Sequence, residues 1–202
     1  MKSRFTTRDI ALISLLAALW AALEISLGSA LKLFKIPFSG SILTFLGLFI
    51  IFAGRCSLSR RGSVVIMGAT TAFLKLVYLG GLALFPVTGI LIESVLVELI
   101  LKKQPPTRIE FLVAGSAGLL WSLFHPFFAQ GVLAGWGLLR VYVLVIERGT
   151  RLLGIESQYA WIVFAVLIFI HAALGLLAGS LGWKFSRIIL HRSHTAPVHK
   201  IA

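Results

Sequence analysis

Long apolar runs constrain this chain more than any other feature. Six of them stand between polar or turn-forming segments, at residues 9–31, 39–54, 62–79, 84–101, 109–129 and 157–182. A hydrocarbon core of about 30 Å is crossed by about 20 helical residues, and backbone that faces lipid must satisfy its hydrogen bonds internally. We therefore predict an all-α integral membrane protein, a bundle of six transmembrane helices in which the short second run is tilted or dips in from the surface.

The composition excludes the common soluble classes. The chain is 58% hydrophobic and 13% charged, and its mean hydropathy of +0.99 is too high for a water-exposed surface. A net charge of +12 would fit a nucleic-acid partner on a soluble domain, but here the basic residues cluster between apolar runs, so no nucleic-acid partner is predicted. The single cysteine, Cys56, provides neither a disulfide nor a CxxC metal site, and no metal ligand is predicted.

The basic residues also predict the topology. Most of the 19 lysines and arginines precede the first run, separate the second from the third and the fourth from the fifth, or follow the sixth. With six crossings these segments share one side, which the positive-inside rule makes cytoplasmic. We predict a multi-pass plasma-membrane protein with both termini in the cytoplasm, a transmembrane domain at 1–190 and a basic cytoplasmic tail at 191–202.

Residues 136–154 form a further apolar segment with a polar stripe. Its charged residues recur at i, i+7, i+8 and i+11, and they are Arg140, Glu147, Arg148 and Arg151. One polar face on an apolar helix is typical of a helix that lies in the membrane interface. We therefore predict an interfacial amphipathic helix between the fifth and sixth spans, since a seventh crossing would put the basic tail outside.

The first run carries a ridge of small residues. Ser14, Ala18 and Ala22 follow one another at four-residue steps, with Ala17 and Ala21 beside them. Small side chains let helix backbones approach closely in lipid, so the ridge packs either against another helix of this chain or against a partner subunit. Glu24 projects about 130° away from the ridge at 100° per residue, which gives this helix two distinct faces.

Ionisable residues inside the runs are costly and mark functional or paired positions. Glu24, Lys75, Glu93 and His125 fall in the central or outer parts of their spans, where they can line one outward-facing cavity. Lys75 either pairs with a glutamate to hold the bundle or contacts a ligand. By contrast, Glu98 is expected to pair with Lys102, and His171 to be a neutral histidine satisfied by a neighbouring helix.

An aromatic segment accompanies His125. The sequence WSLFHPFF at 121–128 places Trp121, Phe124, His125 and Phe128 at helical spacing. Flat apolar faces beside one polar group suit a heteroaromatic ligand, with Trp121 and Phe128 stacking on it.

These features together resemble the substrate-binding S component of an energy-coupling factor transporter. The resemblance rests on about 200 residues with six spans, a basic start followed by TTRDIALISLLAALWAAL, and the small-residue ridge. It implies a binding subunit that captures a water-soluble vitamin or related micronutrient from outside and catalyses no reaction. It also implies docking through Ala18 and Ala22, or Ala17 and Ala21, onto a membrane-embedded coupling subunit served by two cytoplasmic ATPases. The segment KLFKIPFSG at 32–40, with Lys35, would be the lid, and ATP would bind only to the partners.

Three other classes fit less well. An intramembrane serine hydrolase is suggested by Gly115-Ser116-Ala117-Gly118 with His171, but the glycine spacing is wrong and the segment fits a packing patch better. A stand-alone secondary transporter remains open, although no inverted repeat is evident. The nickel or cobalt branch of the S components carries a methionine and a histidine near the mature N-terminus, and this chain begins MKSRF.

Overall fold

Every secondary-structure element in the described part of the chain is helical. The computed structural model describes residues 5–58, 60–80, 84–129, 143 and 159–195. Its helices are α1 (Thr7–Leu33), α2 (Ser39–Ser57), α3 (Ser63–Leu79), α4 (Leu84–Ile100), α5 (Arg108–Phe128) and α7 (Ala160–Thr195). The first five begin and end within three residues of the predicted spans, because turn residues and charges separate them clearly.

Four of these helices are long and apolar enough to cross a membrane. They are α1, α2, α5 and the segment Trp161–Ile188 of α7. Helices α3 and α4 have 17 residues each, which gives a length of about 25 Å, less than the hydrocarbon thickness of about 30 Å. Four membrane-length helices fit the predicted class of integral membrane protein. The six-span bundle stays a prediction.

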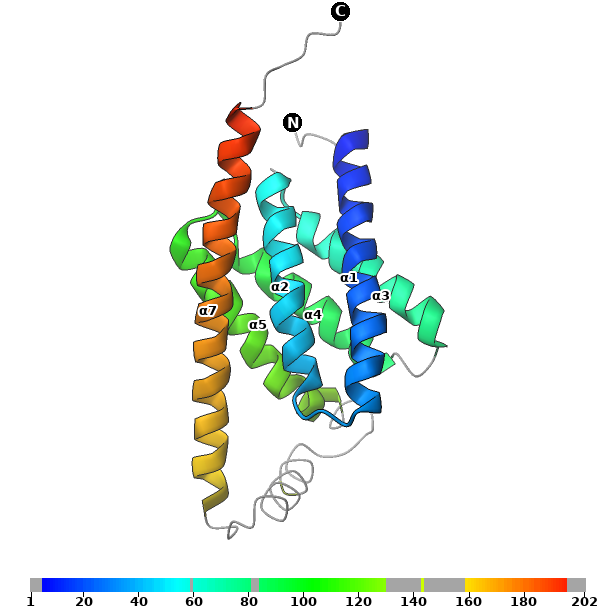
Figure 1. The fold of residues 1–202 in the computed structure, drawn as a ribbon, viewed down its shortest axis with the longest axis vertical. Coiled ribbons are helices and arrows are strands. Elements are labelled where there is room, and N and C mark those ends of the chain that lie inside the picture. The colour runs from blue at the N-terminus through cyan, green and yellow to red at the C-terminus, as the bar shows by residue number, and fades with distance from the viewer. Residues whose placement is uncertain (1–4, 59, 81–83, 130–142, 144–158, 196–202) are drawn as a thin grey trace, which may run out of the picture.

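The helices surround α2. It contacts α1, α3, α5 and α7, while α4 packs between α3 and α5. In Figure 1, α1, α2 and α7 run along the long axis, and α3, α4 and α5 cross them obliquely. The first turn of α1 and the last turn of α7 lie at the same end of the bundle. The side of the membrane on which the two termini lie stays a prediction.

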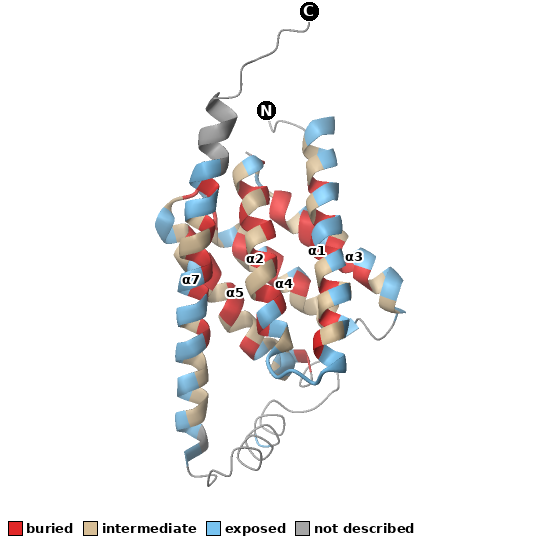
Figure 2. Cartoon of the chain, in the orientation of Figure 1, coloured by how far each residue is buried: buried red, intermediate tan, exposed pale blue. Residues whose placement is uncertain are grey.

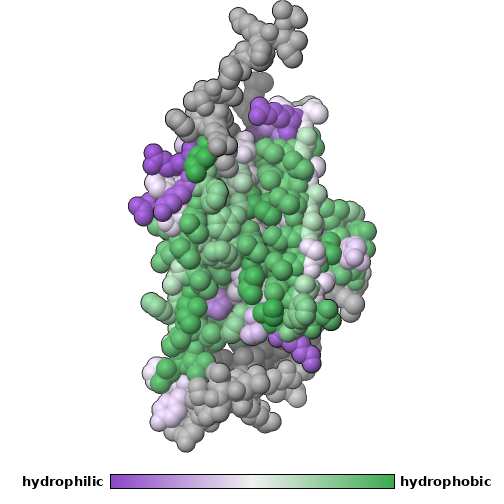
Figure 3. Space-filling model, in the orientation of Figure 1, coloured by the Kyte–Doolittle hydropathy of each residue, from purple (hydrophilic) through white to green (hydrophobic). Residues whose placement is uncertain are grey.

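The outer surface is a broad apolar belt. On the face drawn in Figure 3, hydrophilic residues gather mainly at the two ends, and hydrophobic ones cover most of the surface between them. The buried residues lie on the inward faces of the helices (Figure 2). From Trp161 to Ile170, α7 has no buried residue, as expected for a helix that exposes apolar side chains to lipid.

Small residues bring the backbones of α5 and α7 into contact. A Cβ atom at Gly115 would overlap backbone atoms of Gly175 and Gly179, and one at Gly179 would overlap the backbone at Phe111. Hydrophobic burial is weak between helices in lipid, so close backbone approach is a main source of their association. The prediction that Gly115–Gly118 is a packing patch is thus confirmed.

Polar side chains close the helix ends opposite the α1–α2 connection. Thr6 with Asp9, and Thr107 with Glu110, form capping boxes at the starts of α1 and α5. Glu98 accepts hydrogen bonds from the backbone N–H groups of Gly62 (2.8 Å) and Val64 (2.9 Å) at the start of α3. The prediction that Glu98 pairs with Lys102 is therefore wrong. A carboxylate is held more firmly by two orphan N–H groups at a helix N-terminus than by one exposed lysine.

Two predictions fall largely on residues that the structure does not describe. The interfacial helix at 136–154 lies outside the described residues apart from Val143. Of the tail at 191–202, only 191–195 are described, and there α7 continues as a helix to Thr195 instead of ending before the tail.

Candidate functional site

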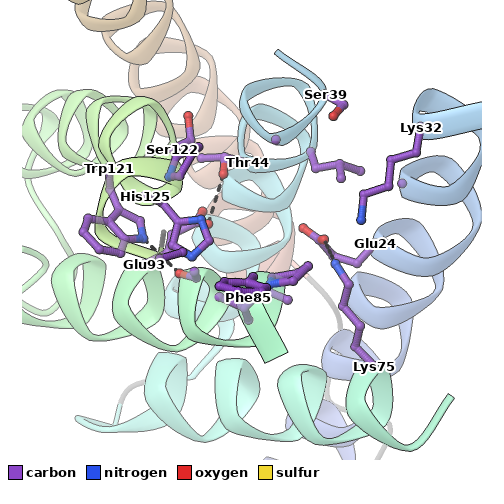
Figure 4. A pocket seen from close by; sticks show the side chains of 18 of the residues that line it. Glu24, Lys32, Ser39, Thr44, Lys75, Phe85, Glu93, Trp121, Ser122 and His125 are labelled. Carbon is purple, nitrogen blue, oxygen red and sulfur yellow. Dashed lines mark hydrogen bonds and ion pairs between the residues drawn. The ribbon is translucent and has the colours of Figure 1, made fainter. Parts of the chain in front are cut away.

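A cavity of about 400 Å³ lies where α1 ends and α2 begins, away from the two chain ends. Five helices, α1 to α5, contribute to its walls, and Figure 4 shows most of the lining side chains. This volume is within the usual range for a small-molecule site. Its polar lining residues are Glu24, Ser29, Lys32, Ser39, Thr44, Lys75, Glu93, Ser122 and His125, and its aromatic ones include Phe85 and Trp121.

An ion pair between α1 and α3 forms one wall. Lys75 Nζ lies 2.5 Å from Glu24 Oε2, and the two residues are only 3% and 6% exposed. One turn earlier on α3, Thr71 donates a hydrogen bond of 3.1 Å to the carbonyl of Ala17, which holds the two helices together. Glu24 and Lys75 therefore supply each other's counter-charge. Of the alternatives left open by the sequence, the structure shows Lys75 paired with Glu24, at the surface of the cavity.

Glu93 projects from α4 into the opposite side of the cavity. It is 3% exposed, and its Oε2 accepts a hydrogen bond of 3.2 Å from Thr44 of α2. Its other oxygen, Oε1, is buried and has no hydrogen-bond partner among the described residues. A buried polar atom without a partner is rare in proteins, so this oxygen is an available acceptor within the site.

Trp121 and His125 form an aromatic wall on α5. Their rings are 5.5 Å apart in an edge-to-face arrangement, and Trp121 Nε1 donates to the carbonyl of Gly89 on α4 at 3.0 Å. His125 Nε2 lies 3.2 Å from Thr88 Oγ1. A Cβ at Gly89 would come within 3.1 Å of the His125 ring, so the glycine lets that ring pack directly against α4. Figure 4 shows this wall facing the Glu24–Lys75 pair across the cavity.

Five of the seven residues predicted to bind substrate line this cavity, and Lys35 and Phe128 do not. Lys35 is exposed in the turn after α1, with a positive φ of 54°. Because α1 continues to Leu33, it is Lys32 that reaches the cavity. Phe128 packs its ring on Trp121 with a centroid separation of 5.7 Å, so it supports the wall from outside.

The predicted lid only partly borders the cavity. Lys32, Ser39 and Gly40 line it, and these are the two ends of segment 32–40. The middle of the segment is exposed and turns through a hydrogen bond from Ile36 N to Leu31 O. The segment therefore flanks the cavity entrance.

Sequence reasoning missed Thr44, Ser122 and Lys32. Thr44 and Ser122 are polar residues inside apolar runs, and that is the signal that could have identified them. Their hydroxyls are too common in membrane helices to be singled out, because such groups often bond to a carbonyl of their own helix. Ser122 does so too, at 2.8 Å from Leu119 O, and it also lies 3.0 Å from Ser41 Oγ.

His171 has the structural role that the sequence predicted. Its Nε2 lies 2.9 Å from Ser41 Oγ on α2, and its Nδ1 lies 2.8 Å from the carbonyl of Leu167. Since a carbonyl only accepts, Nδ1 is the protonated nitrogen, and Ser41 donates to Nε2. Ser116 instead bonds to Ala172 O at 3.3 Å. The serine–histidine pair that an intramembrane hydrolase would need is therefore not assembled between these two residues.

The ridge on α1 divides between two faces. Ala17 and Ala21 are 0% and 3% exposed, so they pack inside the chain and cannot serve as an exposed docking pair. Ser14, Ala18 and Ala22 are exposed on the outer face. The structure thus removes one of the two alternative docking pairs.

Comparison with protein-family models, with curated proteins and with solved structures finds no match for this chain. The class that the described residues define is therefore a helical protein with membrane-length helices around a polar and aromatic cavity.

Proposed function

We propose that this chain is the substrate-binding membrane subunit of an importer of the energy-coupling factor type. In this proposal it crosses the plasma membrane six times with both termini in the cytoplasm, and residues 136–154 lie in the interface. It captures a small water-soluble vitamin or related micronutrient from outside, catalyses no reaction and binds no cofactor. Two ATPases, acting through a membrane-embedded coupling subunit, drive delivery inward.

The cavity is the observation that supports this function most. It has the volume of a small-molecule site and brings carboxylates, lysines, a histidine and a tryptophan together from five helices. Ionisable residues inside apolar helices are expensive and are retained mainly where they pair or bind. The lining includes the end of α1 and the start of α2, at the end of the bundle opposite the start of α1, and the positive-inside rule would place that end outside the cell.

The outer face of α1 supports the proposal that this chain docks on a membrane-embedded coupling subunit. Ser14, Ala18 and Ala22 leave a shallow strip on an exposed apolar helix, where a second helix can approach closely. This strip and the cavity lie on different faces of α1, because Glu24 is buried while Ala22 is exposed. Docking and substrate binding are therefore compatible at the same time.

A thermal-shift screen of the detergent-solubilised protein tests this proposal. The panel would contain water-soluble vitamins, their precursors and nucleobases, because a ligand that binds only the folded state raises its Tm. A concentration-dependent shift with one compound is expected. Gly40→Phe should abolish that shift, because Gly40 lines the cavity and has open space around it. Ala173→Phe, at an exposed position on α7, is the matched control. No shift with any compound would contradict the proposal.

Proteoliposomes separate a binding subunit from a stand-alone transporter. The purified chain alone should bind the identified nutrient without accumulating it, even with a proton or sodium gradient. Accumulation by the chain alone would instead establish secondary transport.

A further inference from the structure

Two carboxylates and two lysines line the cavity, and only one of each forms an ion pair. Glu24 and Lys75 neutralise each other at 2.5 Å, and Lys32 is an exposed residue at the end of α1. Glu93 is the remaining carboxylate of the lining, and no ion pair joins it to Lys32, Lys75 or His125. The interior of the cavity therefore has one acidic group without an ion-pair partner in the described part of the chain.

The geometry of Glu93 makes it an acceptor for a ligand. Thr44 occupies Oε2, and Oε1 is buried without a partner among the described side chains and backbone. In surroundings of low polarity a carboxylate attracts a cation far more strongly than it does in water. A positively charged ligand group would satisfy Oε1 and neutralise Glu93 in one contact.

Two of the neighbouring donors are already engaged. Trp121 Nε1 donates to Gly89 O, and Lys75 donates to Glu24. Because these donors are already bonded, the wall formed by Trp121, His125 and Phe85 presents mainly ring surface to a ligand. The face of a tryptophan ring also attracts cations. Carboxylate and ring thus favour the same ligand chemistry.

We propose that the cavity recognises a ligand with a protonated amine or amidine attached to an aromatic ring, with Glu93 as the counter-charge and Trp121 against the ring. This inference rests on the proposed function, because it names the chemistry of the nutrient bound at the same site. It also specifies the charge of the preferred ligand: the cavity should bind cationic ligands more tightly than neutral or anionic ligands of the same shape.

Three probes that share one ring test the preference. Tryptamine carries an ammonium group, tryptophol a hydroxyl and indole-3-acetate a carboxylate, so they differ mainly in the charge of the side arm. Thermal shifts are measured at millimolar concentrations with the purified wild-type protein. Tryptamine should raise the Tm in a concentration-dependent way, with an apparent Kd at least tenfold lower than those of the other two.

Glu93→Gln provides the residue-specific test. It keeps the side-chain size and removes the charge, so the tenfold preference for tryptamine over tryptophol should disappear. Glu110→Gln is the matched control, because Glu110 is a carboxylate in the capping box of α5, outside the cavity lining, and the preference should remain. Equal shifts with the three probes, the largest shift with indole-3-acetate, or an unchanged preference in Glu93→Gln would each overturn the inference.

The wild-type comparison decides the question even if a variant fails to fold. No shift with any of the three probes also overturns the inference. If a neutral or anionic nutrient from the vitamin panel binds while tryptamine does not, the inference is wrong and the binding function stands. If neither panel gives a shift, both are wrong.

Discussion

At the scale of single residues, this chain buries charge in two different ways. Glu24 and Lys75 form a complete pair, whereas Glu93 keeps one oxygen without a described partner. Burying two charges is costly, and the cost is recovered only when both partners are present with good geometry. The two sites should therefore respond in opposite ways to removal of a charge.

Breaking the pair should destabilise the protein. In Lys75→Met, Glu24 becomes an unpaired buried carboxylate, and we expect a loss of about 3–5 kcal/mol in the free energy of unfolding. The double variant Glu24→Gln/Lys75→Met should recover most of that loss, because no charge is left alone. Detergent thermal denaturation of the wild type, both single variants and the double variant measures the coupling. A Lys75→Met protein as stable as the wild type would contradict this account.

Without ligand, Glu93→Gln should not lower the Tm. The glutamine removes a buried acidic group that no ion pair holds among the described residues, and it can still accept from Thr44 through its amide oxygen. Thermal denaturation in the absence of ligand checks this expectation. A large fall in Tm would mean that the charge of Glu93 itself stabilises the folded state.

At the scale of helices, stability depends on contacts between one helix and the backbone of another. Glu98 of α4 caps α3, and the glycines of α5 and α7 allow their backbones to touch. Both contacts join helices whose pairing is not evident from either helix alone.

Glu98→Ala should leave the N–H groups of Gly62 and Val64 without their acceptor. Loss of buried hydrogen-bond partners costs about 1–3 kcal/mol, so we expect a lower Tm. Lys102→Ala is the informative control: it should have little effect, because the carboxylate of Glu98 bonds to α3. If Lys102→Ala were as destabilising as Glu98→Ala, the ion pair expected from spacing would be the dominant contact.

A larger residue in the α5–α7 contact should prevent correct packing. Gly179→Leu places a side chain against the backbone at Phe111, which cannot move as a side chain can. Overpacking usually costs about 1–3 kcal/mol, and we expect the upper end or beyond. Ala173→Leu adds the same bulk at an exposed position of α7 and should be tolerated. Size-exclusion profiles and Tm values compare the two variants.

At the scale of the whole molecule, α1 has one buried face that borders the cavity and one exposed face of small residues. If the proposed function holds, Ala18→Leu/Ala22→Leu should reduce nutrient uptake by cells while the purified protein keeps its Tm and its affinity for ligand. Ala17→Leu should instead destabilise the fold, since Ala17 is fully buried. Uptake of radiolabelled nutrient, with Tm measured in parallel, distinguishes the two effects. Normal uptake by the double variant would exclude this strip as the docking surface.

The sequence alone determined the helices and much of the cavity. Apolar length fixed the bounds of α1 to α5, because lipid demands helices and because turn residues interrupt the runs. The cost of ionisable groups in apolar helices identified Glu24, Lys75, Glu93 and His125. The aromatic spacing around His125 identified Trp121, and all five residues line the cavity.

Only the tertiary structure decided which residues face each other. Spacing along one helix fixes a direction around its axis, but the partner on that side depends on how helices pack. For that reason Glu98 bonds to α3 instead of Lys102, Ala17 and Ala21 turn inward while Ala18 and Ala22 stay exposed, and Lys32 replaces Lys35 at the cavity. The unpartnered oxygen of Glu93 likewise follows from which neighbouring groups come within hydrogen-bond reach, and helical periodicity does not contain that information.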